Sequence, residues 1–237
     1  MKILAVDTST TSGSIALLDD AKVVAEWTTE SPQTHNRQLL KKVDLIMREL
    51  GWRLEQLGGF AVTSGPGSFT GLRIGVTTIK TIAWAARKPF VSIPSLDALA
   101  APLGFTALPI CPLIDARKNE IYFSFYQPDG TGQVRPLAPY RVDSPERIVT
   151  RVQGPTIFCG DGWPRCEELF VKELGGWALA APAPFHIIRA GFVGNLAQRR
   201  FSERQGDDPL TSFPCYVRPS EAEIMHPKTA CTAWRGS

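Results

Sequence analysis

The sequence predicts an α/β protein made of two similar halves with a cleft between them. A strand that ends on an aspartate, a polar turn and a returning strand occur twice, at residues 2–18 and again at residues 107–126. After the first three strands, helical and extended apolar patterns alternate, which is typical of a sheet that contains parallel strands. The second half is shorter and less regular than the first.

In the first half, three strands form a meander before the first helix. The amphipathic stripe of that helix contains Leu39, Val43, Ile46 and Leu50, and Gly51 ends it. The predicted strands are residues 2–7, 13–18, 22–28, 59–63 and 90–93, and the predicted helices are residues 35–50, 68–86 and 96–103.

In the second half, Pro136 and Pro139 interrupt residues 134–142, so this segment is expected to be at best an edge strand. The other predicted strands are residues 107–114, 120–126 and 156–159, and helices are expected from Ser144, at 164–174 and at 185–204. We expect a first domain over residues 1–103, a second over residues 104–208 and an extended tail over residues 209–237.

The glycine-rich stretch at residues 64–75 joins a buried strand to a long helix. Gly65 and Gly67 allow a tight turn around Pro66, and Ser68 stands at the N-cap position. The first backbone N–H groups and the positive end of the helix dipole would form a generic anion site. A tight turn before a well-capped helix, with no ligand, explains the same residues.

The helix after this turn is apolar on more than one side, which predicts a second covering surface besides the sheet. Glycines four residues apart suggest close backbone contact with a partner helix. A cation at Arg73, near the positive end of the dipole, predicts an anion beside it. The predicted interface residues are Leu40, Met47, Phe69, Gly71, Leu72, Arg73, Gly75, Val76 and Ile79.

The composition is that of an ordinary globular protein, with 43% apolar and 21% charged residues among 237. A net charge of +3 without a Lys/Arg run does not indicate nucleic-acid binding by this chain alone. No apolar run approaches the ~20 residues that span a bilayer, and no signal-peptide layout is present. Five scattered cysteines predict reduced thiols, so we expect a cytoplasmic protein without membrane contact.

Four segments of the chain resemble the bacterial TsaB (YeaZ) family. They are ILAVDTST at residues 3–10, SGPGSFTGLRIG at 64–75, IDAR with EIY at 114–122, and YVRP at 216–219. The resemblance covers residues 1–223 and implies an actin/Hsp70/sugar-kinase (ASKHA) fold of two βββαβα domains.

The resemblance also implies a role in making N6-threonylcarbamoyladenosine at position 37 of tRNAs that read ANN codons. In that family TsaB is the non-catalytic partner of the related catalytic subunit TsaD. The ATPase TsaE joins the two, and a separate synthase supplies threonylcarbamoyl-AMP. The chain is then expected to pair with itself when TsaD is absent, and to meet tRNA only through the complex.

The residues available for chemistry agree with a non-catalytic subunit. The catalytic relatives carry His-x-x-x-His where this chain has Ser95 and Leu99, and neither residue is a suitable ligand for zinc or iron. We therefore expect no metal and no required cofactor. The single histidines His35 and His186, each at the start of a predicted helix, more often serve in capping or packing than in catalysis.

The predicted cleft contains one candidate nucleotide site, at which ATP or ADP would bind at the interface of the complex. In ASKHA ATPases an aspartate at the end of the first strand holds metal and phosphate, but a Gly-Gly pair close to it is missing here. An Asx-turn and an ion pair across a turn are the plain alternatives. The candidate residues are Asp7, Thr8, Ser9, Thr10, Asp115 and Arg117.

The residues leave two alternative functions to be considered. An independent ASKHA-type ATPase or small-molecule kinase would turn over ATP without a partner. A proteolytic regulator would need the ligand pair that is missing at residues 95 and 99.

Overall fold

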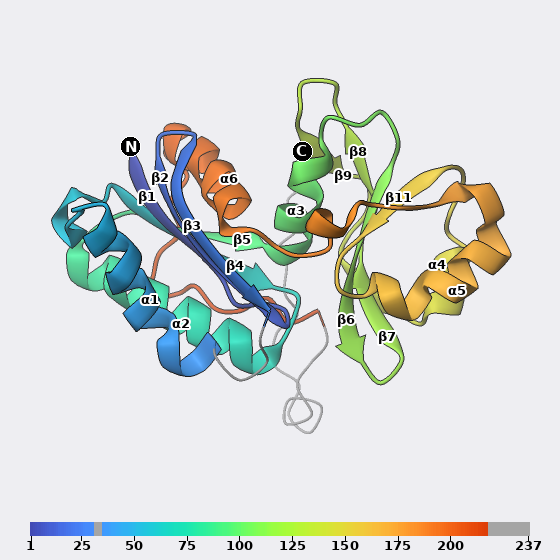
Figure 1. Ribbon diagram of the computed structural model, residues 1–237, viewed down its shortest axis with the longest axis horizontal. Helices are drawn as coiled ribbons and strands as arrows, with labels where there is room; N and C mark the ends of the chain where they lie inside the picture. Colours follow the sequence, from blue (N-terminus) through green and yellow to red (C-terminus); the bar gives the residue numbers. More distant parts are fainter. Residues whose placement is uncertain (31–34, 218–237) are drawn as a thin grey trace. The chain divides into compact units, whose positions relative to one another are not determined.

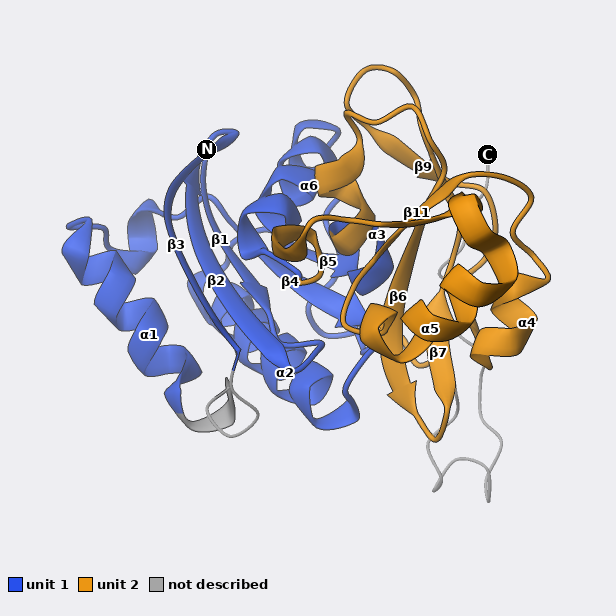
Figure 2. Ribbon diagram, turned by 45° about the vertical axis from the view of Figure 1, so that its right-hand side comes forward, with its two compact units in different colours: residues 1–98, 188–214 blue, residues 99–187, 215–237 orange. Residues whose placement is uncertain are grey.

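The computed structural model describes residues 1–30 and 35–217, and the side chains of residues 35–37 lie outside the description. The chain forms two compact units (Figure 2). Of the described residues, unit 1 contains 1–30, 35–98 and 188–214, and unit 2 contains 99–187 and 215–217. The units therefore do not follow the predicted division at residues 103 and 208, because the chain returns to unit 1 after residue 187.

Unit 1 is built on a five-stranded sheet with the order β3-β2-β1-β4-β5. The first three strands are antiparallel, and β4 and β5 run parallel to β1. The strands are β1 (Lys2–Asp7), β2 (Ser12–Asp19), β3 (Lys22–Glu30), β4 (Gly59–Gly65) and β5 (Phe90–Pro94). All five strands were predicted to within two residues at each end.

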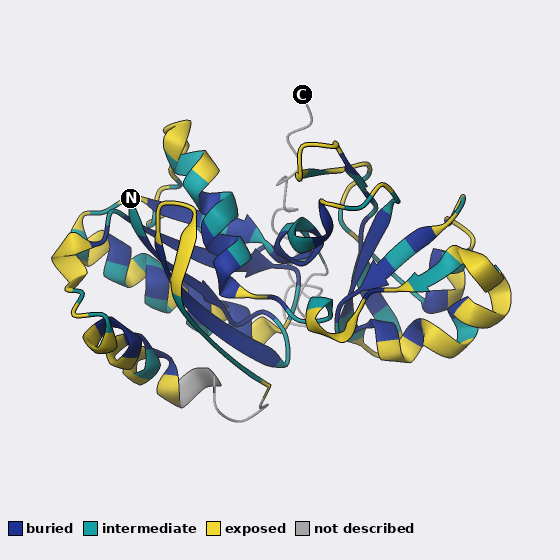
Figure 3. Cartoon of the chain, turned by 45° about the horizontal axis from the view of Figure 1, so that its top comes forward, coloured by how far each residue is buried: buried dark blue, intermediate teal, exposed yellow. Residues whose placement is uncertain are grey.

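Helices cover both faces of this sheet (Figure 1). The helices α1 (His35–Glu49) and α2 (Phe69–Ala86) pack against the face that carries Leu4, Val6, Leu17 and Phe60. On the other face, α6 (Ala190–Ser202) places Gly194 against Leu18. Because both faces are covered, β1 and β4 are buried along nearly their whole length, as Figure 3 shows. The remaining elements of unit 1 are η1 (Leu54–Gln56) and the first four residues of α3 (Ser95–Ala100), whose last two residues are counted in unit 2.

Unit 2 contains a seven-stranded sheet in which β10-β7-β6-β11-β12 form the main order and β8 joins β9 to β6. Its core includes an aromatic cluster of Phe158, Trp163 and Phe170, with ring centroids 4.9 to 6.2 Å apart. The strands are β6 (Ile110–Arg117), β7 (Glu120–Phe123), β8 (Tyr126–Pro128), β9 (Val134–Pro136), β10 (Arg141–Asp143), β11 (Thr156–Cys159) and β12 (Ala178–Ala180). The helices are η2 (Ala101–Leu103), α4 (Pro145–Val149), α5 (Trp163–Leu174), η3 (Gly175–Trp177) and η4 (Ala183–Phe185).

The strand expected at 107–114 is found as β6 at residues 110–117, and the segment 134–142 contains the short strand β9 and most of the short strand β10. Three further elements of the second half also differ from the prediction. The expected strand at 120–126 is split into β7 and β8, and the hydroxyl of Ser124 between them donates to the carbonyl of Ala138. The expected helix at 185–204 begins only at Ala190, although Ile188 shares its apolar spacing. The short strand β12 pairs with β11 and was not predicted. In each case a contact distant in sequence decides the local structure.

The start of α6 is capped by side chains of the sheet, since its own N-cap residue, Arg189, supplies no side-chain cap. The carboxylate of Glu26 accepts the N–H of Gly191 at 2.8 Å and pairs with Arg189. The hydroxyl of Ser14 accepts the N–H of Ala190 at 2.9 Å. These bonds satisfy backbone N–H groups that the start of a helix leaves unpaired. They also attach α6 to strands β2 and β3 of the unit 1 sheet.

Residues 207–213, which we name the strap, follow α6 and attach to the edge strand β5. The backbone N–H of Asp207 donates to the carbonyl of Phe90 at 2.8 Å. The Asp207 carboxylate accepts the N–H and hydroxyl of Ser92 at 2.7 and 2.6 Å and the guanidinium of Arg200 at 2.7 Å. Burial alone would raise the pKa of Asp207, but the hydrogen bonds from Arg200 and Ser92 outweigh it and hold that pKa below its ordinary value.

The Asp207 bonds predict a pH-dependent contribution to stability. Because its folded pKa is lowered, the stabilisation is present above the unfolded pKa of about 3.9 and is lost as the pH falls through the folded value. We expect Asp207→Asn to cost about 1.5 kcal/mol in unfolding free energy at pH 7, and this cost should shrink towards zero as the pH falls below the unfolded pKa and through the lowered folded pKa. Urea unfolding of both proteins across this range measures the difference. A gap that stays constant with pH would contradict the assignment.

Candidate functional site

The carboxyl end of β1 carries a buried hydrogen-bond network centred on Asp7. One carboxylate oxygen of Asp7 accepts the N–H of Ser9 at 3.0 Å, the hydroxyl of Ser9 at 2.6 Å and the hydroxyl of Thr63 at 2.6 Å. Asp7, Thr8 and Ser9 are all buried. The bonds to Ser9 form the Asx-type turn that was the plain alternative, while the Thr63 bond joins the ends of β1 and β4.

The glycine-rich loop before α2 packs directly on the backbone of residues 8 and 9. The N–H of Ser68 donates to the carbonyl of Ser9 at 2.7 Å, and the hydroxyl of Thr8 donates to the carbonyl of Gly71 at 2.8 Å. A Cβ at Gly67 would meet the carbonyl oxygen of Ser9, and a Cβ at Gly71 would meet that of Thr8. The glycines are therefore required by a contact inside unit 1.

The predicted N-cap is confirmed, because the Ser68 hydroxyl accepts the N–H of Gly71 at 3.3 Å. Two of the backbone N–H groups that would form an anion site, those of Ser68 and Gly71, are therefore already bonded within the chain. Thr10 bonds Ser12. The structure thus assigns intramolecular partners to the residues that the sequence proposes for phosphate.

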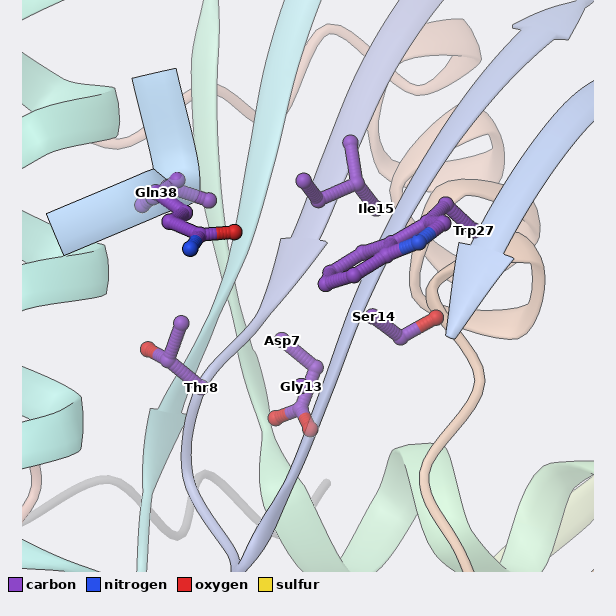
Figure 4. A pocket seen from close by; sticks show the side chains of 8 residues that line it. Asp7, Thr8, Gly13, Ser14, Ile15, Trp27 and Gln38 are labelled. Atoms are coloured by element: carbon purple, nitrogen blue, oxygen red, sulfur yellow. The ribbon is translucent and has the colours of Figure 1, made fainter. Parts of the chain in front are cut away.

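A pocket lies between α1 and the first three strands (Figure 4). Its wall combines the indole ring of Trp27, which lies beside Ile15, with polar side chains that include Asp7, Thr8 and Gln38. Its empty space is about 230 Å³ including the part open to solvent, below the ~300 Å³ at which small-molecule pockets commonly begin. The pocket that these described residues line is therefore small for a nucleotide.

In unit 2, Asp115 lies at the end of β6 in a compact ion-pair cluster. Its carboxylate is 3.3 Å from the guanidinium of Arg117 and 3.1 Å from that of Arg165, and Asp161 accepts its backbone N–H at 3.1 Å. The carboxylate also accepts the backbone N–H of Arg117 at 2.9 Å. The ion pair across the turn, weighed against a phosphate site, is therefore present.

Most residues of the predicted interface lie in the core of unit 1. Met47, Leu72, Val76 and Ile79 are buried, and Gly71 and Gly75 face Thr8. The prediction that the two glycines meet a partner helix was wrong, because the loop at residues 8–9 fills that space. The predicted interface residues that are exposed are Leu40, Phe69 and Arg73.

A stripe of exposed side chains runs along the outward side of α2, and only part of this stripe was predicted from the sequence. Arg73 lies with its guanidinium carbon 4.0 Å from the ring centroid of Phe69. Thr77, Lys80 and Trp84 continue the stripe at helical spacing, and Trp84 is 60% exposed. Leu45 of α1 is also exposed. Helical spacing counted from Arg73 predicts these positions as neighbours on one side of α2. Because α2 is apolar on several sides, the sequence does not show which side faces outward, and only the burial of each residue in the structure does.

A known protein family and several characterised proteins are similar to this chain over most of its length. The family described as TsaD, tRNA N6-adenosine threonylcarbamoyltransferase, matches residues 24–204. The tRNA threonylcarbamoyladenosine biosynthesis protein TsaB of Bacillus subtilis (strain 168) is 31% identical over 226 residues, which are 94% of this chain and 96% of that protein. The chain belongs to the TsaB family.

Solved structures agree with the TsaB family and its fold. YeaZ from Pseudomonas aeruginosa is similar with a TM-score of 0.79 and 28% identity, over 91% of this chain and 99% of that one. The activator of the 2-hydroxyisocaproyl-CoA dehydratase from Clostridium difficile, with bound ADPNP, is 12% identical with a TM-score of 0.52, over 86% of this chain and 97% of that one. The second likeness concerns the fold alone, and the predicted ASKHA fold is confirmed.

In this TsaB-family chain, positions 95 and 99 hold no metal ligands. Ser95 and Leu99 are both buried in α3. Among the side chains that the structure describes, those of residues 1–30 and 38–217, no group of three or more His, Cys, Asp or Glu is arranged to hold a metal ion. His186 has both ring nitrogens near backbone oxygens, of Gly160 at 3.2 Å and Ala181 at 2.8 Å, which is a packing role.

Three cysteines of unit 2, Cys111, Cys159 and Cys166, are buried and have a raised pKa. Burial raises the pKa of the Cys111 and Cys159 thiols well above the ordinary value and that of Cys166 to about 12. Since the thiolate is the nucleophile, these three residues are poor candidates for catalysis. The side chain of His35, Cys231 and the tail beyond residue 217 lie outside the described residues. Within the described part of the chain, no helix is long and apolar enough to cross a membrane.

Proposed function

We propose that the chain is a non-catalytic subunit that pairs with a TsaD-like catalytic subunit. The complex would transfer threonylcarbamoyl to adenosine 37 of tRNAs that read ANN codons. Membership of the TsaB family supports this proposal, because the relatives are named for threonylcarbamoyladenosine biosynthesis.

The observation that carries the proposal is the surface of α1 and α2. Large apolar side chains lie exposed on the outer sides of these two helices, whose inner sides are already buried against the sheet. They are Leu40, Leu45, Phe69 and Trp84. Exposed apolar side chains on adjoining elements are typical of protein–protein interfaces, so we assign this surface to the partner, and to a second copy of the chain when the partner is absent.

The residues at the end of β1 support a structural role rather than an independent ATPase. One oxygen of the Asp7 carboxylate accepts hydrogen bonds from Ser9 and Thr63, and the N–H of Ser68 in the loop donates to the carbonyl of Ser9. In this proposal a TsaE-like ATPase joins the complex, any ATP or ADP binds at the subunit interface, and tRNA contacts the chain only within the complex.

The experiment is co-purification with the TsaD-like protein of the same organism, followed by a threonylcarbamoyl-transfer assay with and without this chain. We expect a stable complex, and transfer that depends on both subunits. The chain alone serves as the control for ATP turnover. Transfer that proceeds equally without this chain, or substantial ATP hydrolysis by the chain alone, would overturn the proposal.

Arg73 gives a test of the surface itself. We expect Arg73→Glu to weaken the complex by more than about tenfold, since a reversed charge at a partly buried contact costs several kcal/mol in association. Because Arg73 is exposed, the melting temperature should hardly change. Arg199→Glu, an exposed arginine on the opposite face of the sheet, is the matched control. Calorimetric titration and thermal melts of both variants give the answer, and equal affinities would remove Arg73 from the interface.

A further inference from the structure

Strand β5 lies at the edge of the unit 1 sheet, because the strand order of that sheet ends on it. The carbonyl of Pro89 accepts the N–H of Phe60 in β4 at 2.9 Å. Since the backbone groups of successive residues in a strand face opposite neighbours, Phe90 and Ser92 direct their N–H and C=O groups away from the sheet. An edge with such outward groups is a template on which another strand can pair.

The strap and the end of α6 bond these outward groups of β5. The N–H of Asp207 donates to the carbonyl of Phe90 at 2.8 Å, and the two residues form an antiparallel bridge. The Asp207 carboxylate accepts the N–H of Ser92 at 2.7 Å, and the guanidinium of Arg200 donates to the Ser92 carbonyl at 2.9 Å. Three outward groups are thus bonded, two of them by side chains, in the place where a sixth strand would bond them with its backbone.

The strap does not continue as a strand beyond Asp207. The Asp208 carboxylate accepts the N–H of Leu210 at 2.9 Å, and the N–H of Ser212 donates to the Asp208 carbonyl at 3.0 Å, so the backbone turns away from β5. At the far end of this turn the Ser212 carbonyl accepts the ammonium group of Lys80 at 3.0 Å. Figure 1 shows the segment, in orange, running on from α6. The strap is therefore fixed at both ends and covers the edge through Asp207.

The sequence of β5 favours pairing with another strand if its edge is uncovered. Its residues with high β-propensity are Phe90, Val91 and Ile93. The segment between Pro89 and Pro94 carries no charge, although charges and prolines are the usual means by which native sheets avoid edge-to-edge association. The two prolines limit the segment at its ends, and between them the outward groups are protected by Asp207 and Arg200.

We propose that the strap is a latch that protects the edge of the unit 1 sheet against pairing with another strand. Asp207 closes the latch, because it bonds β5 through both its backbone and its carboxylate. Its release frees the carbonyl of Phe90 and the N–H of Ser92. The strand that then pairs is β5 of a second copy, which has the same length and brings no like charge. This inference concerns the chain alone and does not depend on the proposed partner.

The experiment measures the average mass of the full-length chain and its variants by light scattering over a range of protein concentrations. Antiparallel pairing of two β5 edges joins copies in twos, so Asp207→Ala should reach about twice the mass of the unaltered chain at high concentration. Ile46→Val is the matched control, because it modestly destabilises the unit 1 core and leaves the strap intact. Its mass should equal that of the unaltered chain.

Ser92→Pro in the Asp207→Ala background locates the contact. The N–H of Ser92 faces outward, so proline removes the donor that an added strand needs and breaks no bond to β4. The mass should return to that of the unaltered chain. Amide hydrogen exchange gives the same information without a second substitution, since the Ser92 N–H of Asp207→Ala should exchange quickly in dilute solution and become protected as the concentration rises.

Circular dichroism shows which variants are folded. If Asp207→Ala is not, Arg200→Met takes its place, because it removes the donor to the Ser92 carbonyl and keeps most of the aliphatic stem. A folded latch variant with the mass of the unaltered chain would overturn the inference. Equal association of the latch variant and Ile46→Val, or association without protection of the Ser92 N–H, would overturn it as well. The transfer assay on the unaltered chain decides the proposed function separately.

Discussion

Gly71→Ala is expected to destabilise unit 1 by about 3 kcal/mol or more. Alanine favours a helix over glycine by about 1 kcal/mol, so propensity alone predicts the opposite sign. The added Cβ would collide with the Thr8 carbonyl oxygen. Thr8 is buried, its hydroxyl donates to the carbonyl of Gly71, and the backbone of the next residue, Ser9, is hydrogen-bonded on both sides. Overpacking against an atom that cannot move costs at the upper end of the usual range. Urea unfolding measures the loss.

The reason for the Gly71 effect can be separated from a general sensitivity to alanine. Gly176→Ala is the control, because a Cβ at Gly176 has no neighbour within 4 Å. At Gly75 the added Cβ would meet the hydroxyl of Thr8, so Thr8→Ala should partly rescue Gly75→Ala but not Gly71→Ala. A Gly71→Ala protein as stable as the parent, which pairs less well with its partner, would restore the interpretation that this glycine faces another helix.

Asp7→Ala is expected to have a comparable effect, about 3 kcal/mol or more. The substitution removes an acceptor of three hydrogen bonds and leaves the donors of Ser9 and Thr63 buried. Each unsatisfied buried donor costs about 1–3 kcal/mol. Thermal and urea unfolding measure the loss.

Asp7→Asn is the informative companion of Asp7→Ala. Its amide oxygen can still accept from Ser9 and Thr63, so it should lose less stability than the alanine variant. If Asp7 acts only in folding, transfer activity of the complex should follow the fraction of folded protein in both variants. Full stability together with lost ATP binding in Asp7→Asn would instead assign Asp7 to a nucleotide site.

The first half of the fold was largely predictable because its signals are local. Strand β1 has an apolar run bounded by Asp7, α1 has a clear amphipathic stripe, and α2 has an N-cap and no breaker before Pro89. The motif at residues 64–75 was also located correctly. The role of these glycines was predicted wrongly. A glycine is equally suitable for a contact with a partner helix and for a contact with the loop at residues 8–9, and the sequence does not distinguish the two.

The second half shows where local signals fail. Ile188 has the spacing of a helical residue, yet the helix starts at Ala190, where Ser14 and Glu26 supply the caps. The membership of α6 in unit 1 depends on Gly194 fitting against Leu18. The partner residue in each contact lies more than 150 positions earlier in the chain, and periodicity carries no information about such pairs.

The sequence by itself determined the fold class, the order of the elements in the first half, the family, and the absence of metal ligands at positions 95 and 99. These follow from residue identity and short-range spacing. Only the tertiary structure decided that Gly71 and Gly75 face Thr8, that Arg73 and Trp84 lie outward, and that the strap attaches to Ser92 and Lys80. In a helix that is apolar on several sides, burial of any of these sides would be favourable. Only the packing of segments distant in sequence decides which side stays exposed and available to a partner.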